Sequence, residues 1–244
     1  MAENTEDGKK KQYPEEVFFE DARYRRLMMQ YRCAILEVET KFRVLNTEFS
    51  LQHNRNPIET IKTRLKSPAS IVEKMQRKGW ELSPESIESH IFDVAGIRII
   101  CSFPEDIYTL AEELMQQDDI VVIDIKDYIA HPKANGYRSL HLILDIPIFL
   151  SDQKKHMRAE VQLRTIAMDF WASLEHKLKY KQDIEDADRI AAELKKCADT
   201  ICQVDNQMQG IRRMIERRKW ESEEERGKVL EHRIEERGNL MEDD

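Results

Sequence analysis

The sequence lacks several features that would each place it in a particular class of protein. No run approaches the roughly 18 to 20 apolar residues that a membrane helix needs, and the polar, charged N-terminus lacks the apolar stretch of a signal peptide. The four cysteines form no CxxC pair, so neither a disulfide framework nor a zinc site is indicated. A glycine-rich phosphate loop of the Walker or dinucleotide type is also missing. We therefore expect a cytoplasmic protein with reduced thiols.

The charge balance narrows the range of partners. The chain has 244 residues and a net charge of -8, whereas sequence-independent binding to nucleic acid needs an excess of Lys and Arg. This balance still leaves room for a local basic pocket. Charged residues make up 35% of the chain against 41% hydrophobic residues, which favours one domain with a modest core and long solvated helices.

Helices are indicated where apolar residues recur every three or four positions. This spacing predicts helices over residues 14–51, 69–78, 84–89, 104–117 and 165–181. Ser67 is a candidate N-cap with Pro68 at the first helical position, and Gly79 is expected to end the same helix.

Strands are indicated by apolar runs and by alternation. The predicted strands cover residues 97–103, 120–125, 139–148 and 160–164. The first of them contains Arg98, which is costly in an apolar strand unless an anion or a stacking partner meets it. In the last two, alternation separates an apolar face from polar residues, and if both strands share a sheet, one surface carries His141, Glu160, Gln162 and Arg164.

The C-terminal region has a different pattern. From Ala187 to Ile215, apolar residues alternate steps of three and four, which is a heptad seam. A lone helix of this length needs packing to be stable, so we expect the seam to contact either the N-terminal helix or another subunit.

The order of elements predicts an α+β fold, with a mixed or mostly antiparallel sheet flanked by helices and long helices at both ends. The expected organisation is a disordered N-terminus (1–13), a main domain that includes the first helix (14–182), an oligomerisation helix (183–220) and a charged, partly disordered tail (221–244).

The candidate chemistry is centred on Asp93 and Glu160. Two carboxylates near strand ends, beside several cations, are the common solution for binding Mg²⁺ and for phosphoryl transfer. The loop from Lys133 to Arg138 adds two cations and an exposed aromatic, which suits a purine nucleotide. From spacing alone the signal is weak, and an ordinary sheet with a solvated polar face is the competing interpretation.

Five ordered sequence blocks resemble the small alarmone synthetases, the single-domain members of the RelA/SpoT family, and most closely their RelP type. The blocks are Arg64-Leu65-Lys66-Ser67 with Lys74; Asp93 to Arg98; Lys126 to Ile129; Pro132 to His141; and Glu160 to Thr165. The resemblance covers roughly residues 41–181. It implies a nucleotidyltransferase-like sheet and transfer of the β,γ-pyrophosphate of ATP to the 3′-hydroxyl of GDP or GTP, which yields AMP and ppGpp or pppGpp.

The resemblance also implies roles for individual residues. Asp93 would bind Mg²⁺, and Glu160 would bind metal or activate the 3′-hydroxyl. Arg64 and Arg98 would sandwich adenine, and the ATP phosphates would be held by Lys66, Lys74 and Arg77. Tyr137 would stack on guanine, and the other residues expected at the GDP or GTP site are Lys126, Lys133, Asn135, Arg138, His141, Gln162 and Arg164. For three of these we keep a plainer alternative: His141 as a sheet-face histidine, Arg164 as a residue that orients its neighbours, and Lys126 as a solvated lysine.

The resemblance further implies a ring-like homotetramer built through the terminal helices, and synthesis without hydrolysis, since the chain carries no His-Asp hydrolase motif. The alternative function is a catalytically idle nucleotide- or RNA-binding regulator with the same fold, which the presence of both carboxylates disfavours. The sequence does not rank GDP against GTP.

Overall fold

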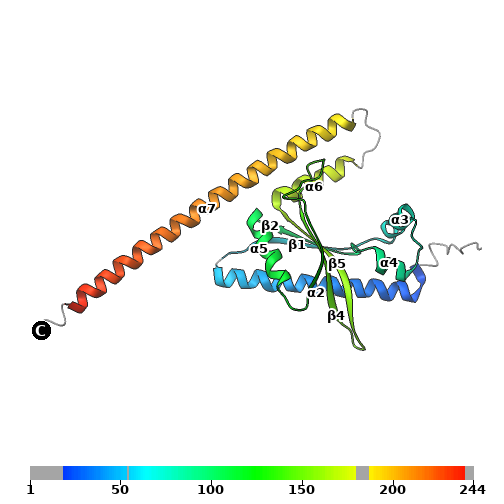
Figure 1. Ribbon diagram of the computed structural model, residues 1–244, viewed down its shortest axis with the longest axis horizontal. Coiled ribbons are helices and arrows are strands. Elements are labelled where there is room, and N and C mark those ends of the chain that lie inside the picture. The colour runs from blue at the N-terminus through cyan, green and yellow to red at the C-terminus, as the bar shows by residue number, and fades with distance from the viewer. Residues whose placement is uncertain (1–18, 54, 180–186, 240–244) are drawn as a thin grey trace, which may run out of the picture.

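The structure, a computed structural model, describes residues 19–53, 55–179 and 187–239 (Figure 1). Its elements are α2 (Ala22–His53), β1 (Ile58–Leu65), α3 (Pro68–Lys78), α4 (Pro84–His90), β2 (Ala95–Cys101), α5 (Pro104–Met115), β3 (Val121–Asp127), β4 (Leu140–Phe149), β5 (Lys154–Thr165), α6 (Ile166–Lys179) and α7 (Ala187–Asn239). The predicted disordered segment 1–13 lies outside the described residues. Within them, no helix is both long and apolar enough to cross a membrane.

The five strands form a single sheet in the order β1-β2-β5-β4-β3. Strands β2 and β5 run parallel, and every other neighbouring pair is antiparallel. The chain is therefore an α+β protein with a mixed sheet flanked by helices, as the element order predicts.

Strand β1 is absent from the predicted elements. It lies at the edge of the sheet, and among its eight residues only Ile58 is fully buried. An edge strand with one neighbour buries little surface, so polar residues such as Lys62 and Arg64 break the alternation that identifies a strand. Its pairing with β2 nevertheless places both of these cations beside the centre of the sheet.

The hydrophobic core lies between α2, α5 and one face of the sheet. Helix α2 contacts β1, β2, β4 and β5, and it buries Tyr31, Val38 and Phe42 almost completely. Burying one such large side chain stabilises the fold by about 1.5–3 kcal/mol. The predicted apolar faces of β4 and β5 complete this core with Leu140, Leu142, Leu144, Val161 and Leu163.

The predicted helix ends are confirmed where side chains cap them. Ser67 Oγ accepts a hydrogen bond from the Ser70 amide, and Gly79 ends α3 with a φ of 68°. Thr165 Oγ1 accepts a hydrogen bond from the Met168 amide at the start of α6. These caps fix α3 and α6 at opposite ends of the polar face of the sheet (Figure 1).

Helix α7 is longer than predicted, because it continues past residue 220 to Asn239. Its N-terminal half contacts α6 and α5, while its C-terminal half extends past the rest of the described chain (Figure 1). Most of the predicted seam does not pack within the chain: Val204, Met208, Ile211 and Ile215 remain 46–52% exposed. Of the two partners expected for this seam, the N-terminal helix does not cover these residues, and packing on another subunit stays a prediction.

Candidate active site

The strand register places most of the predicted site residues on one face of the sheet, because residues paired across neighbouring strands point to the same side. Arg98 of β2 is paired with Lys62 of β1 and with Gln162 of β5. Gln162 is paired in turn with His141 of β4, which is paired with Lys126 of β3. A continuous polar row therefore crosses all five strands.

Beside this row, Gly96 of β2 is paired with Arg64 on one side and with Glu160 on the other. Because glycine carries no side chain, nothing on β2 separates these two residues. Arg64 and Arg98 are diagonal neighbours on adjacent strands, at a spacing of roughly 7–8 Å, where two guanidinium groups can lie on both sides of a flat ring. Arg64 is exposed, and the Nε of Arg98 is buried without a hydrogen-bond partner among the described residues.

Asp93, just before β2, is held by two lysines. Lys66 Nζ lies 3.0 Å from Asp93 Oδ2, and Lys74 Nζ, from α3, lies 2.8 Å from Oδ1. Burial on its own would raise the pKa of the Asp93 carboxyl, but the hydrogen bonds and charges of the two lysines outweigh it and hold this pKa below its ordinary value. Asp93 is therefore an ionised carboxylate whose charge is balanced by cations.

Glu160, on β5, is held by partners of a different kind. His141 Nδ1 lies 3.1 Å from Glu160 Oε1, and Gln162 Nε2 donates to Oε2 at 2.9 Å. Burial and the charge of Asp93 raise the pKa of the Glu160 carboxyl. The interaction with His141 and the hydrogen bond from Gln162 lower this pKa by a larger amount, so the net pKa lies below the ordinary value. Asp93 directly precedes β2, and Gly96 near the start of that strand is paired with Glu160, so both carboxylates lie near the same end of β2.

Both oxygens of Glu160 are connected to Arg164. Arg164 Nη2 donates to the Tyr137 hydroxyl at 2.6 Å and to Gln162 Oε1 at 3.0 Å. The Tyr137 hydroxyl lies 2.8 Å from His141 Nε2. We assign a proton to His141 Nδ1, because this nitrogen then donates to Glu160 and the two chains of hydrogen bonds from Arg164 both end on that carboxylate. Arg164 is buried, and these two hydrogen bonds orient Tyr137 and Gln162, while its expected role at the GDP or GTP site stays a prediction.

Asp169 is a site residue that the sequence analysis misses. This buried residue in the first turn of α6 accepts hydrogen bonds from Lys62, Arg98 and Arg164, at 2.9, 3.2 and 3.3 Å. It is the anion that Arg98 requires. The sequence signals that such a partner must exist, but it does not indicate that the partner comes from a helix 71 residues away.

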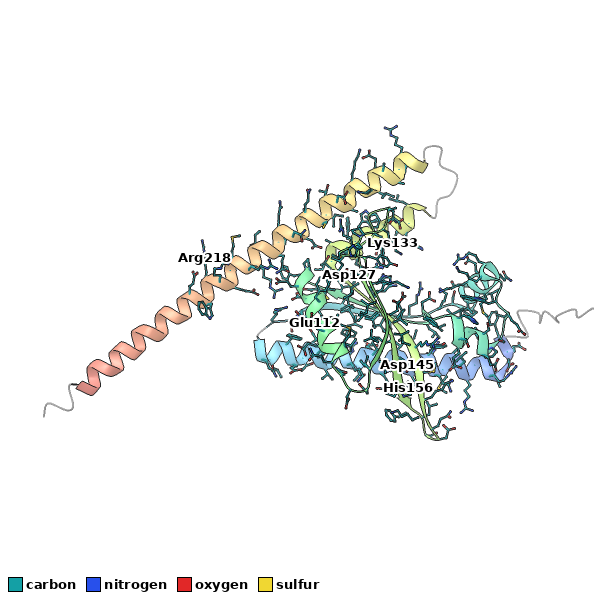
Figure 2. All side chains as sticks on the ribbon, viewed as in Figure 1. Glu112, Asp127, Lys133, Asp145, His156 and Arg218 are labelled. Carbon is teal, nitrogen blue, oxygen red and sulfur yellow. The ribbon has the colours of Figure 1, made fainter. Side chains whose placement is uncertain are left out.

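The loop from Lys133 to Arg138 contributes an aromatic cluster. Tyr128, Tyr137 and His141 lie with ring centroids 5.2–6.0 Å apart in edge-to-face contacts. Lys133 Nζ lies 4.4 Å from the ring centroid of Tyr128 and 4.8 Å from that of Tyr137. Figure 2 shows Lys133 at the end of the sheet that lies beside α6. Like Asp169, Tyr128 has no role in the sequence prediction, although its ring contacts both Tyr137 and His141.

Four other predicted residues have their own partners. Arg77 is largely exposed and pairs with Glu73 on its own helix. Lys126 pairs with Asp124, and this hydrogen bond raises its pKa. The Asn135 side chain bonds to the Tyr137 amide and to Glu175 of α6, which shapes the loop. Arg138 points toward α7, as described below.

The donor set fits a magnesium ion that is shared with a substrate. No group of three or more His, Cys, Asp or Glu side chains able to hold a metal occurs in the part of the chain that the structure describes. Mg²⁺ is usually held by one or two carboxylates together with substrate phosphates and water, and Asp93 and Glu160 supply two. Both are ionised, as a magnesium ligand must be.

Comparison with known proteins gives concordant results. The region found in RelA / SpoT proteins matches residues 63–185. GTP pyrophosphokinase YwaC of Bacillus subtilis is 45% identical over 189 residues, which cover 78% of this chain and 90% of that protein. Small alarmone synthetase 2 from Bacillus subtilis is 43% identical with a TM-score of 0.70, covering 78% of this chain and 98% of that chain. Small alarmone synthetase 1 from the same organism, bound to its product pppGpp, is 35% identical with a TM-score of 0.72, covering 80% and 99%.

Proposed function

The chain belongs to the RelA/SpoT family, and we propose that it works as a small alarmone synthetase in the stringent response. It transfers the β,γ-pyrophosphate of ATP to the 3′-hydroxyl of GDP or GTP. A bond forms between the 3′-oxygen and the β-phosphorus, and the bond from that phosphorus to the oxygen bridging the α- and β-phosphates breaks. The products are AMP and ppGpp or pppGpp, and we expect no hydrolysis of either alarmone by this domain.

One observation carries this proposal: two ionised, partly buried carboxylates, Asp93 and Glu160, lie near the same end of β2, beside a polar sheet face that is rich in cations. Catalysis of phosphoryl transfer consists mainly of positioning the reactants and neutralising charge. This face supplies both kinds of group.

On the donor side, Lys66 and Lys74 would exchange Asp93 for the phosphates of ATP. Both lysines already converge on one point, 3.0 and 2.8 Å from the Asp93 oxygens, so little reorganisation is needed to meet a polyphosphate there. Adenine would lie between Arg64 and Arg98. Arg77 is exposed and would reach the phosphates only by leaving Glu73.

Mg²⁺ would be held by Asp93 and Glu160 together with substrate phosphates. When bound, it would neutralise charge that develops on the transferred group.

On the acceptor side, Tyr137 would stack on guanine, with Lys133, Asn135, His141 and Gln162 around the nucleotide. Lys133 now lies near the Tyr137 ring and would move to an acceptor phosphate. Glu160 would accept the proton of the 3′-hydroxyl, because its two oxygens are oriented by an imidazole and an amide and its charge is not paired with Lys or Arg. Lys126, which is paired with His141 in the sheet, would lie beside the acceptor nucleotide. Arg164 would keep Tyr137 and Gln162 in place around Glu160.

The proposal is tested by incubating the purified protein with Mg²⁺, ATP and either GDP or GTP, and by separating the nucleotides on an anion-exchange column. AMP should appear in a one-to-one ratio with ppGpp or pppGpp, and the two acceptors are ranked in the same experiment. Glu160→Gln serves as the inactive control. If the folded wild-type protein left ATP intact, direct binding of nucleotides and RNA would decide for the idle regulator instead.

We also propose that the protein is a cytoplasmic homotetramer assembled through its terminal helices. The exposed apolar seam of α7 supports self-association, because such a stripe on a long helix is typical of a helix that packs on a partner. Size-exclusion chromatography with light scattering tests it: a monomer at micromolar concentration would contradict it.

A further inference from the structure

Helix α7 docks on the rest of the chain largely through small and polar residues. Among the α7 side chains that the structure describes, the buried ones are Ala198, Asp205 and Gln209, which lie seven and four residues apart on one face. Asp205 Oδ2 accepts a hydrogen bond from Thr165 Oγ1 at 2.5 Å, and Gln209 Nε2 donates to Glu105 of α5 at 2.6 Å. Specific polar contacts of this kind hold the helix against the rest of the chain and also determine its position there.

The same face of α7 touches the loop from Lys133 to Arg138. Gly136 lies in this loop with a φ of +89°, and a Cβ added to it would come within 2.6 Å of Ala198 Cβ. The loop backbone therefore packs directly on α7, at a distance that leaves no room for a larger residue at either position. One residue further along, Asp199 Oδ1 accepts a hydrogen bond from Arg138 Nη2 at 3.4 Å.

These contacts flank the residues that we place in the acceptor site. Tyr137 lies between Gly136 and Arg138, and its hydroxyl belongs to the ring of hydrogen bonds that ends on Glu160. Asp205 contacts Thr165, which directly follows Arg164 in the chain. Arg164 in turn donates a hydrogen bond to the Tyr137 hydroxyl. Helix α7 thus supports two of the partners that determine the position of the Tyr137 ring.

We propose that Ala198 and Asp199 are positioning residues for the acceptor nucleotide, so that the affinity for GDP or GTP depends on the docking of α7 against the Lys133–Arg138 loop. This inference rests on the proposed function. It adds the C-terminal helix to the acceptor site, while the residues we place around ATP lie on β1, on α3, between these two elements and on β2, and make no described contact with Ala198 or Asp199.

The test compares Ala198→Val and Asp199→Asn with Thr200→Val, all in the full-length chain. Ala198→Val adds two methyl groups at the contact with Gly136, and Asp199→Asn removes the charge that meets Arg138 without adding volume. Thr200→Val is a matched control, since Thr200 lies on the same helix and its side chain is exposed. Binding of GDP alone and of a non-hydrolysable ATP analogue alone is measured by calorimetry, together with the KM of each substrate.

We expect Ala198→Val to weaken GDP binding and raise the acceptor KM about tenfold, since small displacements of positioning groups cost up to about 10²-fold. Asp199→Asn should have a smaller effect in the same direction, and Thr200→Val none. The ATP values should stay within about twofold of wild type. An equal change for both substrates, or no change in either variant, would overturn the inference.

The two proposals can fail separately. Wild-type protein that makes alarmone while Ala198→Val binds GDP normally would sink the inference alone. Wild-type protein that binds neither GDP nor GTP would sink the proposed function and the inference with it. If Ala198→Val failed to fold, as judged by circular dichroism, the Asp199→Asn values would decide.

Discussion

Asp93 directly precedes β2 and Glu160 lies on the neighbouring strand β5, yet their partners differ in charge. Asp93 is bound by two lysines, whose hydrogen bonds and charges lower its pKa against the effect of burial. Glu160 is bound by an imidazole and an amide, which orient both of its oxygens without a permanent positive charge. The pKa of both carboxyls is lowered, but the partners that lower it serve different purposes. At Asp93 the cations are available to phosphates, and at Glu160 the orientation of a base is what is maintained.

The largest expected effect comes from Glu160→Gln, which removes the base but keeps the size of the side chain. We expect kcat to fall by about 10³-fold, within the range of 10²–10⁴-fold typical of general acid–base groups. Glu113→Gln, at an exposed position of α5, is the control. Initial rates of AMP formation measure the effect. A variant that kept more than a tenth of the wild-type kcat would remove Glu160 from the role of base.

A second prediction separates the cationic side from the orienting side. Lys74→Met should raise the KM for ATP by about 10- to 100-fold, because it removes a charge-assisted contact to phosphate, and should leave the KM of the acceptor nearly unchanged. Lys78→Met, on the exposed last turn of α3, is the matched control. Equal changes for both substrates would mean that Lys74 holds Asp93 for structural reasons alone.

The third prediction concerns the pH dependence of catalysis. It compares the His141–Glu160 pair with a second histidine–carboxylate pair of similar geometry that lies outside the proposed site. His141 interacts with Glu160 across β4 and β5, and His156 lies 2.6 Å from Asp145 across the same two strands, farther along the hairpin (Figure 2). His141→Ala removes the largest effect that lowers the pKa of Glu160, so burial and Asp93 are left to raise it. A base with a higher pKa is protonated at a higher pH. We therefore expect the acidic limb of the kcat/KM profile to move to higher pH.

Profiles of kcat/KM from about pH 3.5 to pH 8.5 measure this shift, with His156→Ala as the control. The control should keep the wild-type profile. An acidic limb that stayed in place in His141→Ala would mean that another group controls it, and a shift of equal size in both variants would point to a general effect on the hairpin.

A site residue could be predicted from the sequence where the pattern that identifies it involves only its neighbours in the chain. Alternation in β4 and β5 predicts that His141, Glu160, Gln162 and Arg164 share one face, because the period of a strand depends only on the chain itself. Arg98 indicates that an anion must lie nearby, because an arginine within an apolar strand is costly without one. Asp169 could not be identified as that anion, because its helical position makes it look like an ordinary solvated residue until α6 is packed against the sheet.

The two long helices show the same limit. Periodicity predicts an apolar face in both α2 and α7, and in α2 that face is buried against the sheet. In α7 the residues that dock are Ala198, Asp205 and Gln209, which no hydrophobic pattern singles out, while the predicted seam is half exposed. A pattern predicts which face is apolar, but the partner of that face depends on the tertiary fold. The identification of the five blocks with a family, in contrast, needed no folding information and is confirmed by the comparisons.

The smallest expected effect distinguishes the ring of Tyr137 from its hydroxyl. Tyr137→Phe keeps a stacking surface but removes the hydroxyl that connects Arg164 to His141, a network bond worth about 0.5–1.5 kcal/mol. We therefore expect kcat to fall by about 2- to 10-fold with little change in the acceptor KM, whereas Tyr137→Ala should raise that KM. Tyr108→Phe, which removes a hydroxyl bonded to Asp127, is the control. If Tyr137→Phe instead raised the acceptor KM as much as Tyr137→Ala does, the hydroxyl would contact the nucleotide and would not act through the orientation of His141.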